Sequence, residues 1–286
     1  LLFGVTSLSQ AQTTFKASLS GSNEVPAITT TANGDVTATL TGSSLVITGS
    51  FSGLTGDYAA SHIHTAMAGT GGGVAFTLSP TVDGDSRGGT FEGANNTFAL
   101  TSEQVATLEA QGMYVNIHSS TFGGGELRGQ IVPQSDSYFK ANLSGAFEVP
   151  AAKTMASGGV VLQMVGDSLF VSGSFNELSS VYAASHLHIA PAGSAGGVAF
   201  TLTADVEPDG LSGVYLASDN RFELTTEQKT SLMNREVYIN IHTSNFAGGE
   251  LRGQVTPPVT ASFFTTFSGS AENPSVNTSA SGAAII

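Results

Sequence analysis

All six histidines of this 286-residue chain fall into two triplets with the same internal spacing. The first triplet is His62, His64 and His118, and the second follows 124 residues later as His186, His188 and His242. A pair spaced H-x-H, with a third histidine far along the chain, is typical of a metal site built on β-strands. The sequence therefore predicts two sites, each binding one copper or zinc ion through three imidazoles.

Strand geometry indicates where these imidazoles point. Side chains alternate between the two faces of a strand, so His62 and His64 share a face and Ile63 takes the other. In segment 113–118 the alternation separates an apolar face from a polar one, which holds Tyr114, Asn116 and His118. We expect the two strands to bring three imidazoles together outside the barrel wall, with a fourth coordination position left for water or substrate. The alternative is a set of ordinary surface histidines.

A second motif, GGELRGQ, follows the third histidine of each triplet. It places Glu126 and Arg128 on one strand face, and the second copy repeats them as Glu250 and Arg252. One interpretation is that the glutamate orients a ligand histidine and the arginine guides an anion. The other is a cross-strand Glu–Arg pair that fixes the strand after a glycine turn. The asparagine two residues before the third histidine is a further candidate for a supporting role in both copies (Asn116, Asn240).

Two further repeated features are assigned no chemistry. The string Glu-Val-Pro at 24–26 recurs at 148–150, and a buried valine followed by an edge-strand proline explains it. Tyr58 and Tyr182 precede the H-x-H pairs by four residues. A redox role near copper is one interpretation of these tyrosines, and packing in the core is the one we favour.

The pattern of short alternating segments predicts an all-β fold of tandem Greek-key sandwich or barrel domains, each with one short helix. In the first unit, the predicted strands are 35–40, 45–51, 60–65, 74–78, 89–92, 113–118 and 127–132. The helix is expected to begin at the capping sequence Thr101-Ser102-Glu103-Gln104 and to stop at Gly112.

Repeated starts define the units. FKASLSGSNEVPA begins at Phe15, FKANLSGAFEVPA at Phe139 and FTTFSGSAENP at Phe264, a period of 124 to 125 residues. Such a unit is long enough to bury its own core. We therefore predict domains at 14–134 and 138–257 and the start of a third, incomplete unit at 263–286. Segment 1–13 is predicted to be the end of a secretory signal peptide or an N-terminal strand.

Composition restricts the function classes. The net charge of −13 excludes a nucleic-acid phosphate backbone as a partner, since that requires a basic surface. The chain has no cysteine and only 11% charged residues, which favours a hydroxyl-rich protein that is secreted, extracellular or on the cell surface. The sequence has no apolar run of about twenty residues, so no transmembrane helix is predicted.

Taken together, F-x-A-x-L-S-G-x-x-E-V-P, G-S-F, S-H-x-H, N-I-H and GGELRGQ resemble the CHRD domain, named after chordin and also found in bacterial secreted proteins. The resemblance covers both complete units and the third start, and it implies a secreted tandem β-domain protein. It implies no particular activity.

The order H-x-H, glycine-rich loop, late histidine and G-x-x-R is also similar to Cu/Zn superoxide dismutase, a Greek-key barrel. That similarity implies that His62, His64 and His118 are copper ligands and that Arg128 guides superoxide. It implies the same roles in the second unit for His186, His188, His242 and Arg252. The chain has no bridging histidine and no disulfide, so it lacks the fourth copper ligand and the adjoining zinc site.

Three functions are kept as hypotheses. The first is a secreted structural protein whose modules each bind a transition metal, copper or zinc, through three histidines. The second is a copper-dependent oxidase or dismutase-like enzyme. The third is a metal-free adhesion or filament module, in which the incomplete C-terminal unit pairs with a strand near 1–9 of a neighbouring chain and so forms a homo-oligomer.

Overall fold

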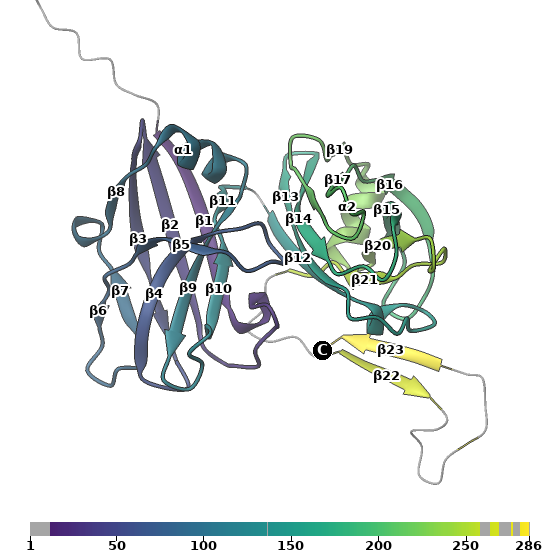
Figure 1. The fold of residues 1–286 in the computed structure, drawn as a ribbon, viewed down its shortest axis with the longest axis horizontal. Helices are drawn as coiled ribbons and strands as arrows, with labels where there is room; N and C mark the ends of the chain where they lie inside the picture. Colours follow the sequence, from purple (N-terminus) through teal and green to yellow (C-terminus); the bar gives the residue numbers. More distant parts are fainter. Residues whose placement is uncertain (1–11, 136, 258–263, 269–275, 277–280, 286) are drawn as a thin grey trace, which may run out of the picture.

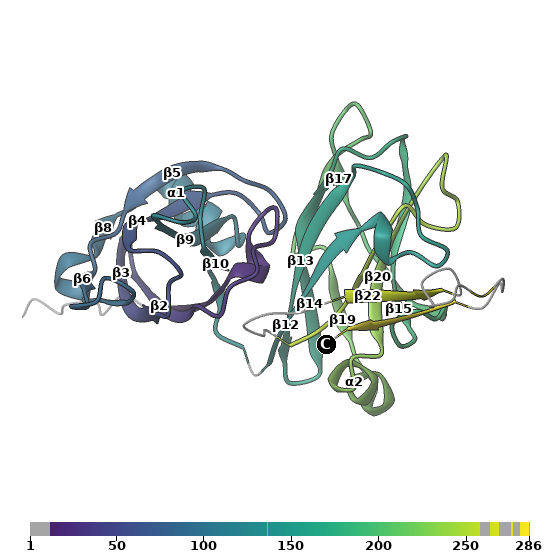
Figure 2. The same ribbon diagram turned by 90° about the horizontal axis from the view of Figure 1, so that it is seen from below.

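The computed structural model describes residues 12–135, 137–257, 264–268, 276 and 281–285. They form two similar, nearly all-β domains that lie side by side, followed by a two-stranded hairpin (Figure 1, Figure 2). The predicted fold class is confirmed, with one short α-helix in each domain. No helix in these ranges is long and apolar enough to cross a membrane. The segment predicted as a signal peptide lies outside the described residues except for its last two positions.

The first domain is one curled antiparallel sheet with the strand order β5-β4-β9-β10-β1-β2-β3-β7-β6. Strand β8 pairs with β3, and β11 pairs with β1. Its elements are β1 (Gln12–Ser20), η1 (Gly21–Asn23), β2 (Asn33–Thr41), β3 (Ser44–Ser52), β4 (Tyr58–Thr65), β5 (Gly73–Thr77), β6 (Thr81–Val82), β7 (Gly89–Phe91), η2 (Gly93–Asn95), β8 (Thr97–Ala99), α1 (Ser102–Glu109), β9 (Met113–Ser119), β10 (Leu127–Gln130) and β11 (Val132–Pro133).

The second domain repeats this sheet in the order β16-β15-β20-β21-β12-β13-β14-β18-β17, with β19 next to β14. Its elements are β12 (Ser137–Ser144), η3 (Gly145–Phe147), β13 (Ser157–Val165), β14 (Ser168–Asn176), β15 (Tyr182–Ile189), β16 (Gly197–Thr201), β17 (Asp205–Val206), β18 (Gly213–Tyr215), β19 (Arg221–Glu223), α2 (Thr226–Met233), β20 (Val237–Thr243) and β21 (Leu251–Gln254).

Local sequence explains the connections. Strands β2 and β3 are joined by a two-residue turn in which Gly42 has a φ of 60°, a conformation that glycine adopts without steric cost. Helix α1 begins with the predicted capping box, in which the Thr101 side chain accepts from the Gln104 amide. The predicted stop at Gly112 is three residues late, because the helix ends at Glu109 and Gln111 takes the left-handed conformation, with a φ of 64°.

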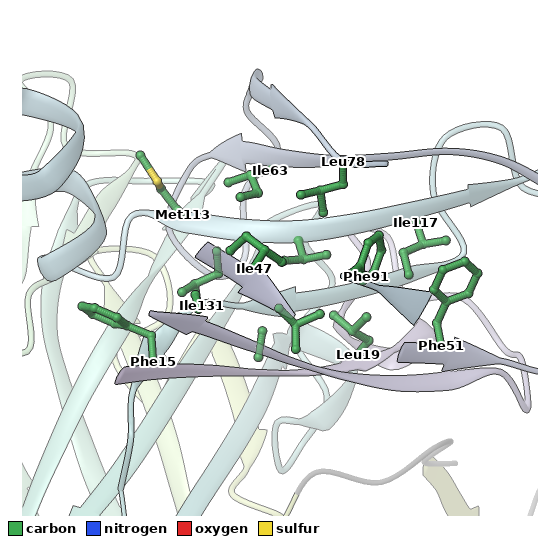
Figure 3. Close-up of a cluster of buried hydrophobic side chains, with 14 of the residues drawn as sticks. Phe15, Leu19, Ile47, Phe51, Ile63, Leu78, Phe91, Met113, Ile117 and Ile131 are labelled. Atoms are coloured by element: carbon green, nitrogen blue, oxygen red, sulfur yellow. The ribbon is translucent and has the colours of Figure 1, made fainter. Parts of the chain in front are cut away.

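The core of the first domain lies inside the curl of the sheet, where strands from both ends of the unit contribute apolar side chains (Figure 3). Ile63 of β4 and Met113, Val115 and Ile117 of β9 are all 0% exposed, and they pack with Phe15 of β1. The predicted alternation is therefore confirmed: the apolar face of β4 and β9 faces the core, and the histidines lie on the outer face. The second domain has an equivalent cluster.

The C-terminal hairpin consists of β22 (Phe264–Ser268) and β23 (Ser281–Ile285). Ser268 pairs with Ser281. The equivalent first hairpins of the two domains have the same register, with Ser20 opposite Asn33 and Ser144 opposite Ser157. The C-terminal hairpin therefore has the same register as the first hairpin of each domain. The predicted strand exchange with residues near 1–9 lies outside the described part of the chain.

The two domains contact each other where the loop after β4 meets the outer face of β13 and β14. Ser174 Oγ donates a 2.6 Å hydrogen bond to the carbonyl oxygen of Ala68. Gly69 lies so close to Gly159 that a Cβ on Gly159 would be 3.0 Å from the Gly69 Cα. A side chain at position 159 would therefore require the loop that carries Gly69 to shift.

Candidate metal centre

The first histidine triplet lies on two neighbouring antiparallel strands. In the β4–β9 register, His62 is opposite Asn116, and His118 is opposite Ala60. His62 and His64 are two residues apart and therefore project from the same face, and His118 projects from that face on the adjacent strand. The register thus brings together three imidazoles that are up to 56 residues apart in the sequence.

The three side chains converge at one point. Each offers one ring nitrogen, and these three nitrogens lie within 4.8 Å of one another. The closest two are His62 Nδ1 and His118 Nε2, which are 3.2 Å apart. Ring nitrogens bind zinc at about 2.0–2.1 Å, so two ligands of one ion are separated by a little more than 3 Å. A small movement of His64 would complete a three-nitrogen site.

Backbone carbonyls orient two of the rings. His64 Nδ1 lies 2.9 Å from the carbonyl oxygen of Gly72, and His118 Nδ1 lies 3.0 Å from that of Gly123. Because a carbonyl oxygen only accepts hydrogen bonds, Nδ1 carries the proton in both rings and the lone pair is on Nε2. His64 Nε2 is buried without a hydrogen-bond partner. Such second-sphere hydrogen bonds are what fix metal-ligating histidines in proteins.

The second domain repeats the site. His188 Nδ1 lies 3.0 Å from the carbonyl oxygen of Gly196, and His242 Nδ1 lies 2.9 Å from that of Ala247. The three converging atoms are His186 Nδ1, His188 Nε2 and His242 Nε2, and each is buried with no hydrogen-bond partner. A buried polar atom without a partner is costly. Three such atoms pointing at one another are accounted for if a cation lies between them.

The surroundings favour neutral imidazoles, the form that binds metals. The pKa values of His62 and His118 are lowered mainly by burial and further by the neighbouring histidines. The same causes lower the pKa values of His186 and His188. Protons therefore compete weakly for these nitrogens at neutral pH.

A stack of three side chains supports one ligand in each domain, and it was not predicted. The rings of His64 and Tyr114 are parallel to within 8°, with centroids 5.0 Å apart. The guanidinium carbon of Arg128 lies 3.6 Å from the Tyr114 centroid. Strand alternation places Tyr114 on the histidine face of β9. The neighbour of Tyr114 on that face depends on the β4–β9 register, which sets the tyrosine opposite His64.

The predicted roles of the GGELRGQ motif need correction. Glu126 is 0% exposed, and its Oε1 accepts hydrogen bonds from Thr30 Oγ1 at 2.7 Å and from the Thr55 amide at 2.8 Å. It therefore fixes two loops and neither orients a ligand histidine nor pairs with Arg128. The alternation argument failed because Glu126 precedes β10 and follows Gly125, which has a φ of 133°. Glu250 repeats these bonds with Thr154 and Ser179.

Arg128 is only 3% exposed. Besides lying over Tyr114, it donates a 3.1 Å hydrogen bond to the carbonyl oxygen of Met67. Arg252 is equally buried, lies 3.5 Å from the Tyr238 centroid and donates to the carbonyl oxygen of Ser194. Both arginines are buried and packed on the tyrosine rings. They are therefore not exposed at the candidate metal site, as an anion guide would be.

Asn116 is a partner of Glu24 in the repeated Glu-Val-Pro string. Its amide donates a 2.6 Å hydrogen bond to Glu24 Oε1 and a 3.1 Å bond to the carbonyl oxygen of Leu127. Asn240 donates to Glu148 in the same way. The prediction of a buried valine in this string is wrong, because Val25 is 42% exposed and lies in the loop after η1.

Burial perturbs the glutamate of the repeated Glu-Val-Pro string in both domains. Desolvation raises the pKa of Glu24 to about 7, against the opposing effects of Arg128 and the Asn116 hydrogen bond. Burial likewise raises the pKa of Glu148 to about 7, with Arg252 opposing it. Each domain therefore contains a buried glutamate that is protonated more readily than an exposed one.

Comparison with known families agrees with these repeats. The model of the CHRD domain matches residues 15–131 and again 139–255. The chain belongs to the CHRD domain family. Each CHRD match contains one complete histidine triplet with its Tyr–Arg stack. No curated protein matches the chain, and the comparisons give no support for the predicted similarity to Cu/Zn superoxide dismutase.

Proposed function

We propose that each CHRD domain of this protein binds one transition-metal ion through its three histidines and is stabilised by it. The observation that carries this proposal is the second triplet. Its three ring nitrogens lie within 4.8 Å of one another, and all three are buried without hydrogen-bond partners. Metal binding would satisfy the three atoms at once.

The donor set supports copper or zinc as the ion. Neutral imidazoles suit these metals, whereas calcium and magnesium prefer oxygen ligands. Among the described residues, the two groups able to hold a metal contain only histidines. Each centre supplies three ligands, so one coordination position remains for water or for a group on a partner molecule.

The proposal also places the protein outside the cell, as a structural or surface protein. Its support is the low content of charged residues, the absence of cysteine and the membership in the CHRD family. A metal supplied from the surroundings would then determine the stability of each domain, because a ligand that binds only the folded state stabilises that state.

Metal content measured by mass spectrometry tests the proposal. Protein purified without chelator and exposed to Cu(II) or Zn(II) should retain two tightly bound ions per chain. His62→Ala should retain one, His186→Ala should retain one, and the double variant should retain none. The single variants control for each other, because each keeps one intact site. Wild-type protein that retains no metal after desalting would refute the proposal.

A further inference from the structure

A second candidate site lies between the domains, away from the histidines. The domains enclose a crevice of about 560 Å³, within the size range of small-molecule sites. One wall is formed by η1, the loop that follows it and β10, and the other wall by β12, η3 and β13. In Figure 1 this is the region where the turn after β1 faces β12.

A buried cation without an acidic partner lies in this crevice. Lys140 is 5% exposed, and its Nζ donates hydrogen bonds to Ser22 Oγ and, at 2.9 Å, to Asn23 Oδ1. Both acceptors are neutral, and none of the ion pairs within the described residues includes Lys140. Burial alone lowers the pKa of Lys140, to about 8. An ammonium group in such a position is stabilised by an anion.

The burial of this lysine results from the docking of the domains. Its counterpart in the first domain, Lys16, is at the same place in the repeat, but it is exposed and donates to Thr37 Oγ1. The other cation of the crevice, Arg128, already interacts with Glu24, which also lines the space. Lys140 therefore differs from Arg128 in that its hydrogen-bond acceptors are all neutral groups.

Both walls of the crevice also carry apolar side chains, and Val161 is directly opposite Lys140 on the neighbouring strand. Val25 and Ile28 of the first domain line one side, and Phe147 and Val161 of the second line the other. An inorganic anion would use the ammonium group but not these side chains. A ligand with one acidic group and a short apolar part would use both.

We propose that the interdomain crevice binds a small amphipathic organic anion, with its acidic group at Lys140 and its apolar part between Val25, Ile28 and Val161. This site is independent of the metal centres. It also gives the docking of two CHRD domains a consequence that neither domain has alone, because each supplies one wall.

Titration calorimetry with octanoate tests this proposal, with octanol and inorganic phosphate as probes that keep only the apolar part or only the charge. Wild-type protein should bind one octanoate per chain, at least about tenfold more tightly than either control probe. Lys140→Met should weaken octanoate binding about tenfold or more, and the matched variant Lys16→Met should leave it unchanged. The double variant His62→Ala/His186→Ala should also bind octanoate normally, which separates this test from that of the metal sites.

Several outcomes would overturn the proposal. They are an absence of saturable octanoate binding up to millimolar concentrations, phosphate binding as tight as that of octanoate, and unchanged octanoate binding by Lys140→Met. If small-angle scattering shows that Lys140→Met separates the domains, Val25→Asp decides the question, since Val25 is 42% exposed and tolerates substitution. The added carboxylate should weaken octanoate binding about tenfold, and unchanged binding would refute the site.

Discussion

His64 is stacked on Tyr114, with ring centroids 5.0 Å apart and planes 8° from parallel. The second domain has the same pair, His188 and Tyr238, at 4.8 Å and 5°. A ring that is held on one face by a tyrosine and at Nδ1 by a carbonyl has little rotational freedom. The stack therefore keeps Nε2 directed at the other two histidines.

We predict that Tyr114→Ala weakens metal binding at the first centre about 10- to 100-fold, the usual effect of losing a group that orients a ligand. Tyr114→Phe retains the stacked ring and loses only the 3.3 Å contact between the Gly72 amide and the tyrosine hydroxyl. It should therefore stay within a few-fold of wild type. Competition titrations with a chelator measure both affinities. Equal affinities for Tyr114→Ala and wild type would show that the stack does not position His64.

Metal binding should also increase the free energy of unfolding of each domain. At a free metal concentration one hundred times the dissociation constant, each occupied site adds about 2.7 kcal/mol to the free energy of unfolding. His62→Ala should lose this increment for the first domain, while its stability in chelator should match that of wild type. Thermal unfolding with and without metal provides the measurement. A variant that gains as much from the metal as wild type does would contradict the role of His62.

The sequence was sufficient to predict the faces of the strands. Alternation along 113–118 placed Val115 and Ile117 in the core and His118 outside, because side-chain direction in a strand is a local property. The proximity of the histidines was also predicted, because the two strands were expected to lie side by side with all three imidazoles on their outer face, and the ring nitrogens do lie within 4.8 Å of one another. The pairing of His64 with Tyr114 was not, because it depends on the register between β4 and β9, which the whole sheet sets.

Long-range contacts of loops were not predictable either. Glu24 meets Asn116 across a sequence separation of 92 residues, through a loop whose path the local sequence does not define. The burial of Lys140 depends on the docking of a second domain, and no pattern within one repeat encodes it. The sequence signal for Glu24 was only that a glutamate recurs at the same place in the second unit, as Glu148.

The buried glutamates predict a specific pH dependence. The folded pKa of Glu24, about 7, lies above the ordinary glutamate value of 4.5 because burial disfavours the charged carboxylate. Between these two values the folded state holds a proton that the unfolded state has lost, so stability decreases as the pH rises through this window. Glu24→Gln stays neutral and keeps an oxygen that accepts from Asn116. Its stability relative to wild type should increase from pH 4.5 to 7, by at most on the order of 3 kcal/mol.

Chemical denaturation at pH 5 and pH 8 measures this difference. Glu92→Gln, at an exposed position of the same domain, is the matched control and should show no such trend. Glu148→Gln should behave like Glu24→Gln, because burial raises the pKa of Glu148 to about 7 as well. A stability difference between Glu24→Gln and wild type that is the same at both pH values would contradict a perturbed glutamate.

The contact between the domains gives the last prediction. Gly159 lies against Gly69, and a Cβ at position 159 would be 3.0 Å from the Gly69 Cα and 3.1 Å from its nitrogen. The equivalent residue of the first domain is Asp35, which is exposed. Gly159→Asp therefore introduces into β13 the residue that the equivalent strand of the first domain, β2, carries on its exposed surface. In the interface it would place an unpaired carboxylate against the backbone of the β4–β5 loop, at a cost of several kcal/mol.

We expect Gly159→Asp to leave both domains folded and to separate them. Small-angle scattering should then show a larger radius of gyration, while circular dichroism stays unchanged and each centre still binds its metal. The reciprocal variant Asp35→Gly lies outside the interface and should leave the scattering curve as it is. Because Lys140 is buried only by this docking, Gly159→Asp should also expose it and abolish the crevice. An unchanged radius of gyration would mean that the remaining hydrogen bonds, such as that between Ser174 and Ala68, hold the domains together without the glycine contact.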